Sequence, residues 1–511
     1  MRKAAFAAVL LVASVYLLRL DRVAGLIVDD GWYAVLGRSI AQGTGYQLAN
    51  APSPGLLPPD PPGFALLLAP IFWIAPHFPD NVLLLKSLSL LAMLGAVALL
   101  YVQARGRHDW TAELAQLVAI AFALVPAFVW LATSTLMSEC VFTCSQLGAI
   151  ALIGRRRGTW GTASAGLVSG LTVLIRTAGI GLPVGAAVYF LASRQWRRLA
   201  IFSGTVAIVA VPWLVYSRVH EPTMAQRLEH GGAHAFTYGS EFWMRWAGDP
   251  STGTITYRGL PARVMGNVVD IAGRDIAGIV APGLFRGADE SGQEVIALGG
   301  GWVPASMGSA PGTMVVSVML SVIVLLGFVA SWRAGPSVVE FVVPVSLGVV
   351  ALWPQWSYRF VLPLAPFLLM YLVDGLRMLF ARERWLRVSA LALLVVIGLS
   401  LLDHGQYIVR AWTAEPDWIA DAHDVDDLVG WMQQHVSDRD IVATTNPPLI
   451  YLRTGHPTIA SDDYAEQWTA WTGRGVRYLV SLRPSQLPPS RFRYDLLFRT
   501  PRRGYWIVRM R

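Results

Sequence analysis

The chain has 511 residues, of which 54% are hydrophobic and 14% are charged, and its mean hydropathy is +0.48. Soluble domains contain about 25% charged residues, so the composition excludes a protein that is soluble throughout. The formal net charge is +8, but most arginines lie between apolar runs, which is typical of a membrane topology signal rather than of a nucleic-acid surface. We therefore expect a membrane protein with no nucleic-acid partner. Two cysteines, Cys140 and Cys144, lie one helical turn apart in an apolar run, where they form neither a disulfide framework nor a zinc site.

Apolar runs long enough to be spans, or nearly so, recur along the first four fifths of the chain. The first run could be a cleaved signal peptide, but no small-x-small cleavage site follows it, which favours a retained anchor. The interruptions predict about eleven transmembrane helices, at 4–18, 82–103, 114–132, 136–153, 162–175, 179–191, 199–216, 314–330, 338–353, 360–380 and 388–402.

Basic residues fill every second connection between these segments. Short loops rich in Lys and Arg stay on the cytoplasmic side, so the amino terminus is predicted inside and the carboxyl terminus outside. The basic residues are Arg2 and Lys3, then Arg105 and Arg107, Arg155 to Arg157, Arg194, Arg197 and Arg198, Arg333, and Arg382, Arg384 and Arg387.

This orientation places three polar stretches on the outer face. The first, 21–81, begins with a predicted amphipathic helix carrying Trp32, Leu36 and Ile40, passes through a proline-rich break, and ends in a short apolar helix at 63–75 that suits the membrane surface. The second, 219–311, is rich in Trp, Gly and His and is interpreted as a cover over a site.

The third polar stretch is the tail. It predicts a small α/β domain with helices at 425–435 and 464–471 and strands at 441–444, 477–482 and 505–509. We thus expect two domains, a membrane-embedded domain at 1–402 and an extracytoplasmic α/β domain at 403–511.

An acidic pair, Asp29 and Asp30, follows the first apolar segment. Carboxylates at a membrane boundary are costly to place and often functional. The alternative is that both residues cap a helix that starts near Gly31, because acidic side chains suit a helix N-terminus. Capping and catalysis are compatible.

The surrounding motifs resemble a known family. The run DDGWYAVLGRSIAQGTGY at 29–46, followed by PPDPPGFALLLAP at 58–70, is similar to the first outer loop of family 39-type glycosyltransferases with the membrane-embedded C-type fold. That group includes protein O-mannosyltransferases and bacterial lipid A aminoarabinose transferases. The resemblance covers 1–402 and rests on Asp29, Asp30, Tyr33 and Pro61-Pro62-Gly63, with further landmarks at Met137-Ser138-Glu139, Arg176-Thr177-Ala178-Gly179 and Tyr358-Arg359-Phe360.

The resemblance implies transfer of a sugar from a polyprenyl-phosphate donor to an acceptor hydroxyl on the outer face, with inversion. Such a reaction needs a base for the hydroxyl and a way to hold the departing phosphate. Asp29 is the candidate base by its position in the motif. Asp30 is expected to orient the acceptor, to support Asp29 or to contribute to a metal site, and Tyr33 is expected to contact substrate.

Cations near outer span ends are the candidates for the phosphate. Lys86, Arg176 and Arg359 suit a phosphate at the interface, with arginine able to grip it in a fork. The alternative is that they snorkel to lipid head groups. Tyr358 is a candidate substrate contact or part of an aromatic interfacial belt, and Glu139 is equally a ligand, a partner of a ligand or a helix-start acid.

Two other classes of protein would account for part of the sequence, a transporter and a scaffold. A transporter or flippase of a lipid-linked saccharide would use the same arginines, but would show repeated halves and helices broken near mid-bilayer, which the sequence does not indicate. A scaffold would explain only the tail. No metal motif is present, because glycines separate His230 from His234; participation of a divalent cation stays open. The expected partners are the lipid-linked donor, membrane lipid and an unidentified glycan, lipid or protein acceptor, and the Arg-rich composition favours a bacterial inner membrane.

Overall fold

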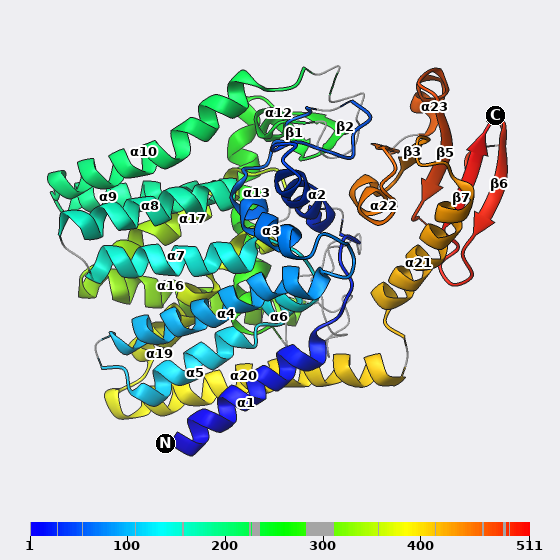
Figure 1. Ribbon diagram of the computed structural model, residues 1–511. Helices are drawn as coiled ribbons and strands as arrows, with labels where there is room; N and C mark the ends of the chain where they lie inside the picture. The colour runs from blue at the N-terminus through cyan, green and yellow to red at the C-terminus, as the bar shows by residue number, and fades with distance from the viewer. Residues whose placement is uncertain are drawn as a thin grey trace.

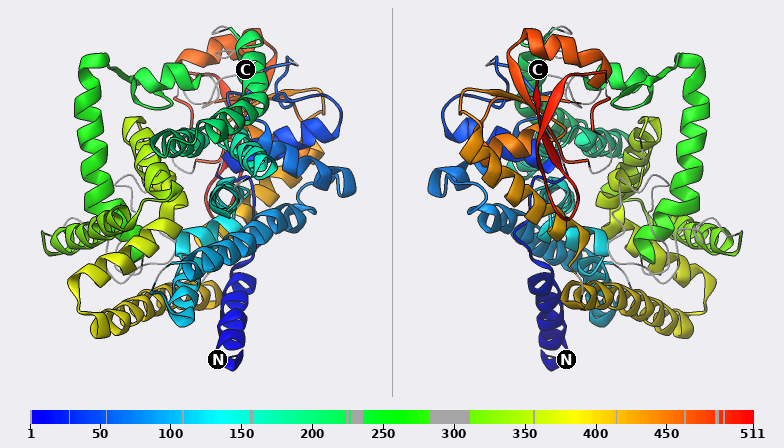
Figure 2. Two further views of the ribbon diagram at one scale, coloured as in Figure 1. Left: turned by 90° about the vertical axis from the view of Figure 1, so that its left-hand side faces the viewer. Right: turned by 90° about the vertical axis from the view of Figure 1, so that its right-hand side faces the viewer.

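A computed structural model describes residues 2–27, 29–53, 55–107, 109–155, 158–223, 226, 236–282, 311–355, 357–413, 415–461, 464–483, 487–489 and 491–511. It shows a large bundle of helices with an α/β unit beside it, next to the helix α2 (Figure 1). The amino terminus lies at the end of α1, which projects from the bundle far from the carboxyl terminus (Figure 2).

Every one of the eleven predicted apolar segments is helical. The bundle helices are α1 (Arg2–Arg19), α4 (Val82–Arg105), α5 (Ala112–Ala123), α6 (Pro126–Thr133), α7 (Glu139–Arg155), α8 (Thr159–Ile175), α9 (Gly181–Ala192), α10 (Trp196–Val219), α16 (Pro311–Ala334), α17 (Val338–Leu352), α18 (Tyr358–Val361), α19 (Ala365–Leu379) and α20 (Arg382–Thr413).

The number of spans differs from the prediction of eleven. Among the described residues, five helices are long and apolar enough to cross a membrane, and a bent pair makes a sixth. Of the other predicted spans, α1 has 18 residues, and α7, α8, α9 and α17 have 12 to 17. The chain is therefore a multi-pass membrane protein with several helices shorter than a full span.

The predicted span at 114–132 is broken. The helices α5 and α6 are bent by 54° at residues 124–125. The break lies directly before Pro126, because a proline disfavours the helical conformation of the residue that precedes it. A helix interrupted within the bundle is a feature that the sequence analysis did not predict.

The first outer loop folds as two helices that pack on each other. They are α2 (Asp29–Ala41) and α3 (Gly63–Ile74). Trp32 and Leu36 on α2 are buried with Leu48 and Ala65, while Leu66, Leu67 and Trp73 of α3 are exposed. Both predicted helices are present. The helix α2 is buried on more than its predicted apolar face, because Ala34, Val35 and Ser39 are buried as well, and the position of α3 at the membrane surface stays a prediction.

The second outer loop contains regular structure in its described part. Its elements are α12 (Tyr238–Trp243), the hairpin β1 (Met244–Trp246) and β2 (Asp249–Thr254), α13 (Leu260–Asp270), the π-helical turn Ile271–Asp275 and α14 (Ile276–Val280). The Ala247 N–H donates to the Pro354 carbonyl, so the hairpin is attached to the loop before α18.

The tail is an α/β unit with a five-stranded mixed sheet. The strand order is β4 (Thr458–Ala460), β3 (Ile441–Thr444), β5 (Val476–Ser481), β7 (Trp506–Met510) and β6 (Tyr494–Arg499), with β3 parallel to both neighbours and β7 antiparallel to both of its own. The helices are α21 (Asp417–His435), α22 (Pro447–Thr454) and α23 (Tyr464–Gly473).

The predicted helices and strands of the tail are present, and α22, β4 and β6 are additions to them. The helix α20 continues to Thr413, so residue 402 lies inside a helix and the α/β unit starts with α21.

Candidate active site

A cavity of about 360 Å³ lies where the two outer loops meet the ends of the bundle helices. The charged residues of the site lie at the ends of helices. Asp29 begins α2 and Glu139 begins α7. Arg176 follows the last residue of α8, and Arg359 lies in the first turn of α18. The charged residues and tyrosines that line the cavity are Asp29, Tyr33, Asp60, Arg176, Tyr238, Glu241 and Arg359.

Four charged side chains form a continuous chain of ion pairs. Arg359 Nη1 lies 3.0 Å from Asp29 Oδ2, and its Nε lies 2.5 Å from Glu139 Oε1. The same Glu139 oxygen lies 2.7 Å from Arg176 Nη1. The Glu139 side chain is fully buried, whereas 48% of the Asp29 side chain is exposed. Glu139 therefore holds two guanidinium groups together. Of the two acids in this chain of ion pairs, Asp29 is the one that lines the cavity.

Tyr33 and Ser138 extend this network. Arg176 Nη1 donates to Ser138 Oγ at 3.2 Å, and the Tyr33 hydroxyl lies 3.4 Å from the same oxygen. The Tyr33 ring packs edge-on against Phe64 at 4.9 Å between centroids, so α3 fixes its orientation.

Two further acids line the cavity and form its acidic wall, Asp60 and Glu241, and the sequence analysis did not identify them as site residues. The Tyr238 hydroxyl donates to Asp60 Oδ1 at 2.8 Å. Burial, together with the carboxylates of Asp60 and Asp29, raises the pKa of Glu241 to about 7. Asp60 lies within the motif PPDPPG, so the motif could have identified it as a candidate site residue. Nothing in the sequence distinguishes Glu241 from other acids of its loop.

Four predicted site residues do not line the cavity: the buried Glu139, which contacts its lining through Arg359 and Arg176, and Lys86, Tyr358 and Asp30. Lys86 is buried and donates to Asp21 Oδ1 at 2.7 Å, to the Asp21 carbonyl at 2.9 Å and to the Thr133 carbonyl at 2.8 Å. An ammonium has three N–H donors, so Lys86 has none left for a phosphate. The buried Tyr358 hydroxyl donates to the Gly278 carbonyl at 3.4 Å.

Asp30 also points away from the cavity. Its Oδ2 accepts a 2.8 Å hydrogen bond from the Gly25 N–H, and the side chain is 1% exposed. Burial raises the pKa of Asp30 to about 6, and the Gly25 hydrogen bond opposes that rise. Of the predicted residues, the structure thus brings together Asp29, Tyr33, Glu139, Arg176 and Arg359.

No cluster of three or more His, Cys, Asp or Glu side chains within the described ranges could hold a metal ion. His230 and His234 lie outside the described residues.

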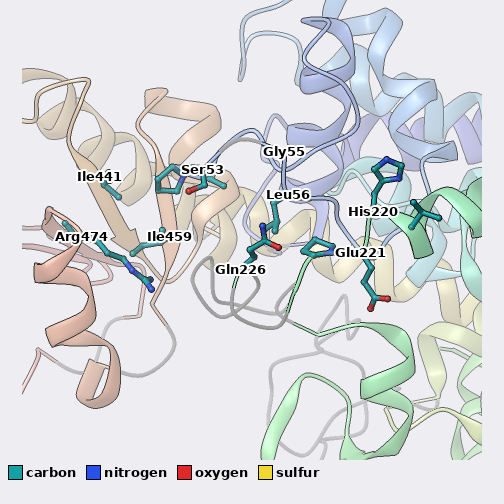
Figure 3. A pocket seen from close by; sticks show the side chains of 14 residues that line it. Ser53, Gly55, Leu56, His220, Glu221, Gln226, Ile441, Ile459 and Arg474 are labelled. Carbon is teal, nitrogen blue, oxygen red and sulfur yellow. The ribbon is translucent and has the colours of Figure 1, made fainter.

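A second cavity, of about 490 Å³, lies between the first outer loop and the α/β unit (Figure 3). Ser53 and Leu56 face Ile459 and Arg474 across it, and His220 and Glu221 line the end next to α10. His220 stacks on Tyr216 and Glu221 pairs with Arg218. Asp29, Arg176 and Arg359 line the first cavity and not this one, so the first cavity is the candidate active site.

Comparisons with known proteins agree with this architecture. Residues 60–249 match the model of glycosyltransferase family 87. Among solved structures, ArnT from Cupriavidus metallidurans bound to undecaprenyl phosphate is 15% identical, with 99% of this chain and 97% of that chain covered and a TM-score of 0.48.

The archaeal oligosaccharyltransferase AglB from Archaeoglobus fulgidus, in complex with an inhibitory peptide and a dolichol-phosphate, is 13% identical, with 94% of this chain and 69% of that chain covered and a TM-score of 0.52. Its apo form is 14% identical, with 93% and 69% covered and a TM-score of 0.53. A search of curated proteins found no match.

The matched family segment contains Asp60, Glu139, Arg176 and Glu241, four of the acidic and basic groups described above. The family match and the shared fold indicate that the chain is a membrane glycosyltransferase. The matching model is that of family 87, so the specific resemblance to family 39 is not confirmed.

Proposed function

We propose that the protein transfers a sugar from a polyprenyl-phosphate donor to an acceptor hydroxyl, with inversion at the anomeric carbon, and that Asp29 is the general base. The observation that carries the proposal is the pairing of the half-exposed Asp29 with Arg359 in a cavity that also contains Arg176. A carboxylate and two guanidinium groups are the chemistry that deprotonation of a hydroxyl and departure of a phosphate require.

In the free protein Arg359 is shared between Asp29 and Glu139. The donor phosphate competes with Asp29 for the Arg359 N–H groups, and its binding releases the Asp29 carboxylate to accept a proton. Glu139 keeps Arg359 and Arg176 in place during this exchange. Donor binding and activation of the base are thereby coupled.

The chemical step is balanced as follows. The acceptor oxygen forms a bond to the anomeric carbon and loses its proton to Asp29. The bond between that carbon and the phosphate oxygen breaks, and the oxygen leaves with the electron pair. Arg359 and Arg176 stabilise the second negative charge that the lipid phosphate gains. Tyr33 is placed to contact the sugar or the acceptor.

The proposed orientation puts the cavity and the α/β unit on the extracytoplasmic face of a bacterial inner membrane, with the amino terminus in the cytoplasm. The basic connections after α9 and α16 support it. Arg194 follows α9, whose other end adjoins the cavity-lining Ile180, and Arg333 precedes α17, whose other end carries Val349 and Val350 of the cavity lining. In this proposal residues 1–402 carry the reaction and the α/β unit lies outside the membrane.

The test uses purified protein, a panel of polyprenyl-phosphate sugars and measurement of the released lipid phosphate. We expect Asp29→Asn to lower kcat by about 10²- to 10⁴-fold, the range of a general base. Asp80→Asn is the matched control, because Asp80 is an exposed acid of the same loop and lines no part of this cavity. Equal activity of Asp29→Asn and wild type would refute the assignment of the base.

The same assay addresses the alternative of a transporter or flippase. The bend between α5 and α6 is a broken helix of the kind that transporters contain, although neither helix lines the cavity. A flippase would move the lipid-linked sugar across vesicle membranes without releasing lipid phosphate.

A further inference from the structure

We propose that the α/β unit sets the position of Asp29, and that Asn446 is the positioning residue through which it acts. This inference rests on the proposed function, because it assigns Asn446 a role only if Asp29 is the base. The loop that precedes α2 is held on two sides, by the acidic pair itself and by α22.

Gly25 is the point where the two sides meet. Its N–H donates to Asp30 Oδ2 at 2.8 Å, and its carbonyl accepts a 2.9 Å hydrogen bond from Asn446 Nδ2. Its φ of +87° is a conformation that glycine adopts without strain. A Cβ at this position would lie 2.8 Å from Leu449 Cδ1. One residue thus joins α2, through Asp30, to α22, through Asn446.

Asn446 is well suited to hold that point fixed. It is 4% exposed, and its Oδ1 accepts from the Leu449 N–H at 3.2 Å as the N-cap of α22. With both side-chain atoms bound, the amide has a single orientation. Loss of this hydrogen bond would leave the buried Gly25 carbonyl without its side-chain donor, which is unfavourable.

The contact between α22 and α2 is close beyond these hydrogen bonds. A Cβ at Gly31 would lie 3.0 Å from Pro448 Cγ, so Pro448 rests against the first turn of α2, two residues after Asp29. Figure 1 shows α22 beside α2. Movement of α22 would therefore move the segment that carries Asp29.

The arginines of the site keep one partner when this contact is loosened, because Glu139, on α7, holds both Arg359 and Arg176. A displaced Asp29 competes less with the donor phosphate for Arg359, so phosphate binding should not weaken. The kinetic signature of the proposed role is a fall in kcat with a donor KM that is unchanged or lower.

The principal variant is Asn446→Ser. A serine hydroxyl can still cap α22, but it is too short to reach the Gly25 carbonyl as well. Because a misplacement of about 1 Å can cost 10²-fold in rate, we expect kcat to fall by about 10- to 100-fold, with a donor KM no higher than that of wild type.

The matched control is Asn50→Ala, which removes another buried side-chain contact between the first loop and the α/β unit. Asn50 Nδ2 donates to Thr458 Oγ1 at 3.1 Å, on the side of the loop remote in sequence from Asp29. We expect its melting temperature to fall as much as that of Asn446→Ser, and its kcat to stay near that of wild type.

Gly31→Ala is a second variant that removes no hydrogen bond. Alanine favours a helix over glycine, so α2 should form, while the added methyl pushes against Pro448. We expect the same fall in kcat in the folded protein.

The inference is overturned if Asn446→Ser and Gly31→Ala, when folded, keep a kcat within about twofold of wild type, far less than the loss expected from a displaced base, while Asp29→Asn is inactive. It is also overturned if Asn50→Ala and Asn446→Ser lose activity equally. Full activity of Asp29→Asn would instead refute the proposed function itself.

Discussion

Arg359 is the residue whose geometry makes the sharpest prediction. Its guanidinium bridges two acids, with Nη1 3.0 Å from Asp29 and Nε 2.5 Å from Glu139. Arg359→Lys keeps the charge but replaces a planar fork with a single ammonium, which cannot reach both acids and a phosphate. The variant therefore tests the shape of the cation separately from its charge.

The magnitude follows from the hydrogen bonds. Each bond to a charged group contributes about 1.5–3 kcal/mol. If the lysine forfeits one such bond to the departing phosphate, kcat/KM should fall by roughly 10- to 160-fold, since each 1.36 kcal/mol is a factor of ten.

The assay is release of lipid phosphate at donor concentrations below KM. Arg377→Lys is the matched control, because Arg377 pairs with Asp109 at 2.5 Å in a partly exposed site away from the cavity, where an ion pair contributes about 0–1 kcal/mol. A folded Arg359→Lys protein with the kcat/KM of wild type would refute the role of the guanidinium fork.

Two further predictions concern Glu241 and Lys86. The pKa of Glu241 is raised to about 7 by burial and by Asp60 and Asp29, so Glu241 is neutral below that pH and anionic above it. Because a second charge on the acidic wall repels an anionic donor, kcat/KM should decline as pH rises through about 7, and Glu241→Gln should remove that decline; identical pH profiles would contradict this. Lys86→Met removes the cation that pairs with Asp21, which leaves the Asp21 carboxylate with the Val23 N–H as a donor but with no counter-charge at that oxygen, and should destabilise the protein by about 3–5 kcal/mol, measured as a lower melting temperature in detergent, with an unchanged donor KM. A raised donor KM of Lys86→Met at the melting temperature of wild type would instead indicate that Lys86 binds the donor phosphate.

The helical segments could be predicted from the sequence because apolar runs and their interruptions are local signals. The lengths of the helices were harder to predict. The break before Pro126 depends on backbone conformation, and a hydropathy window averages over it. The predicted end of the segment 162–175 coincides with the end of α8 at Ile175. In the tail, the pair Pro447-Pro448 resembles a break in a helix, yet proline is favoured in the first turn, and α22 begins there.

The ion pairs of the site join residues that are far apart in the sequence, so local patterns could not predict them. Asp29 and Arg359 are 330 residues apart, and only their resemblance to a family pattern grouped them before the structure was known. Lys86 and Arg359 have the same kind of position, a cation near the end of an apolar run. What distinguishes them is the partner: Lys86 pairs with Asp21, 65 residues earlier, and a sequence alone does not reveal that pairing.

The short helices next to the cavity have a consequence for the bilayer around the protein. The helix α8 has 17 residues and α9 has 12, so they rise about 26 Å and 18 Å, less than the roughly 30 Å thickness of the hydrocarbon layer. Lipids beside them must thin locally to avoid mismatch. Arg176 and Thr177, between these two helices, line the cavity. The thinned patch would bring the phosphate of a long-chain carrier to the level of the guanidinium groups without drawing its tail out of the membrane.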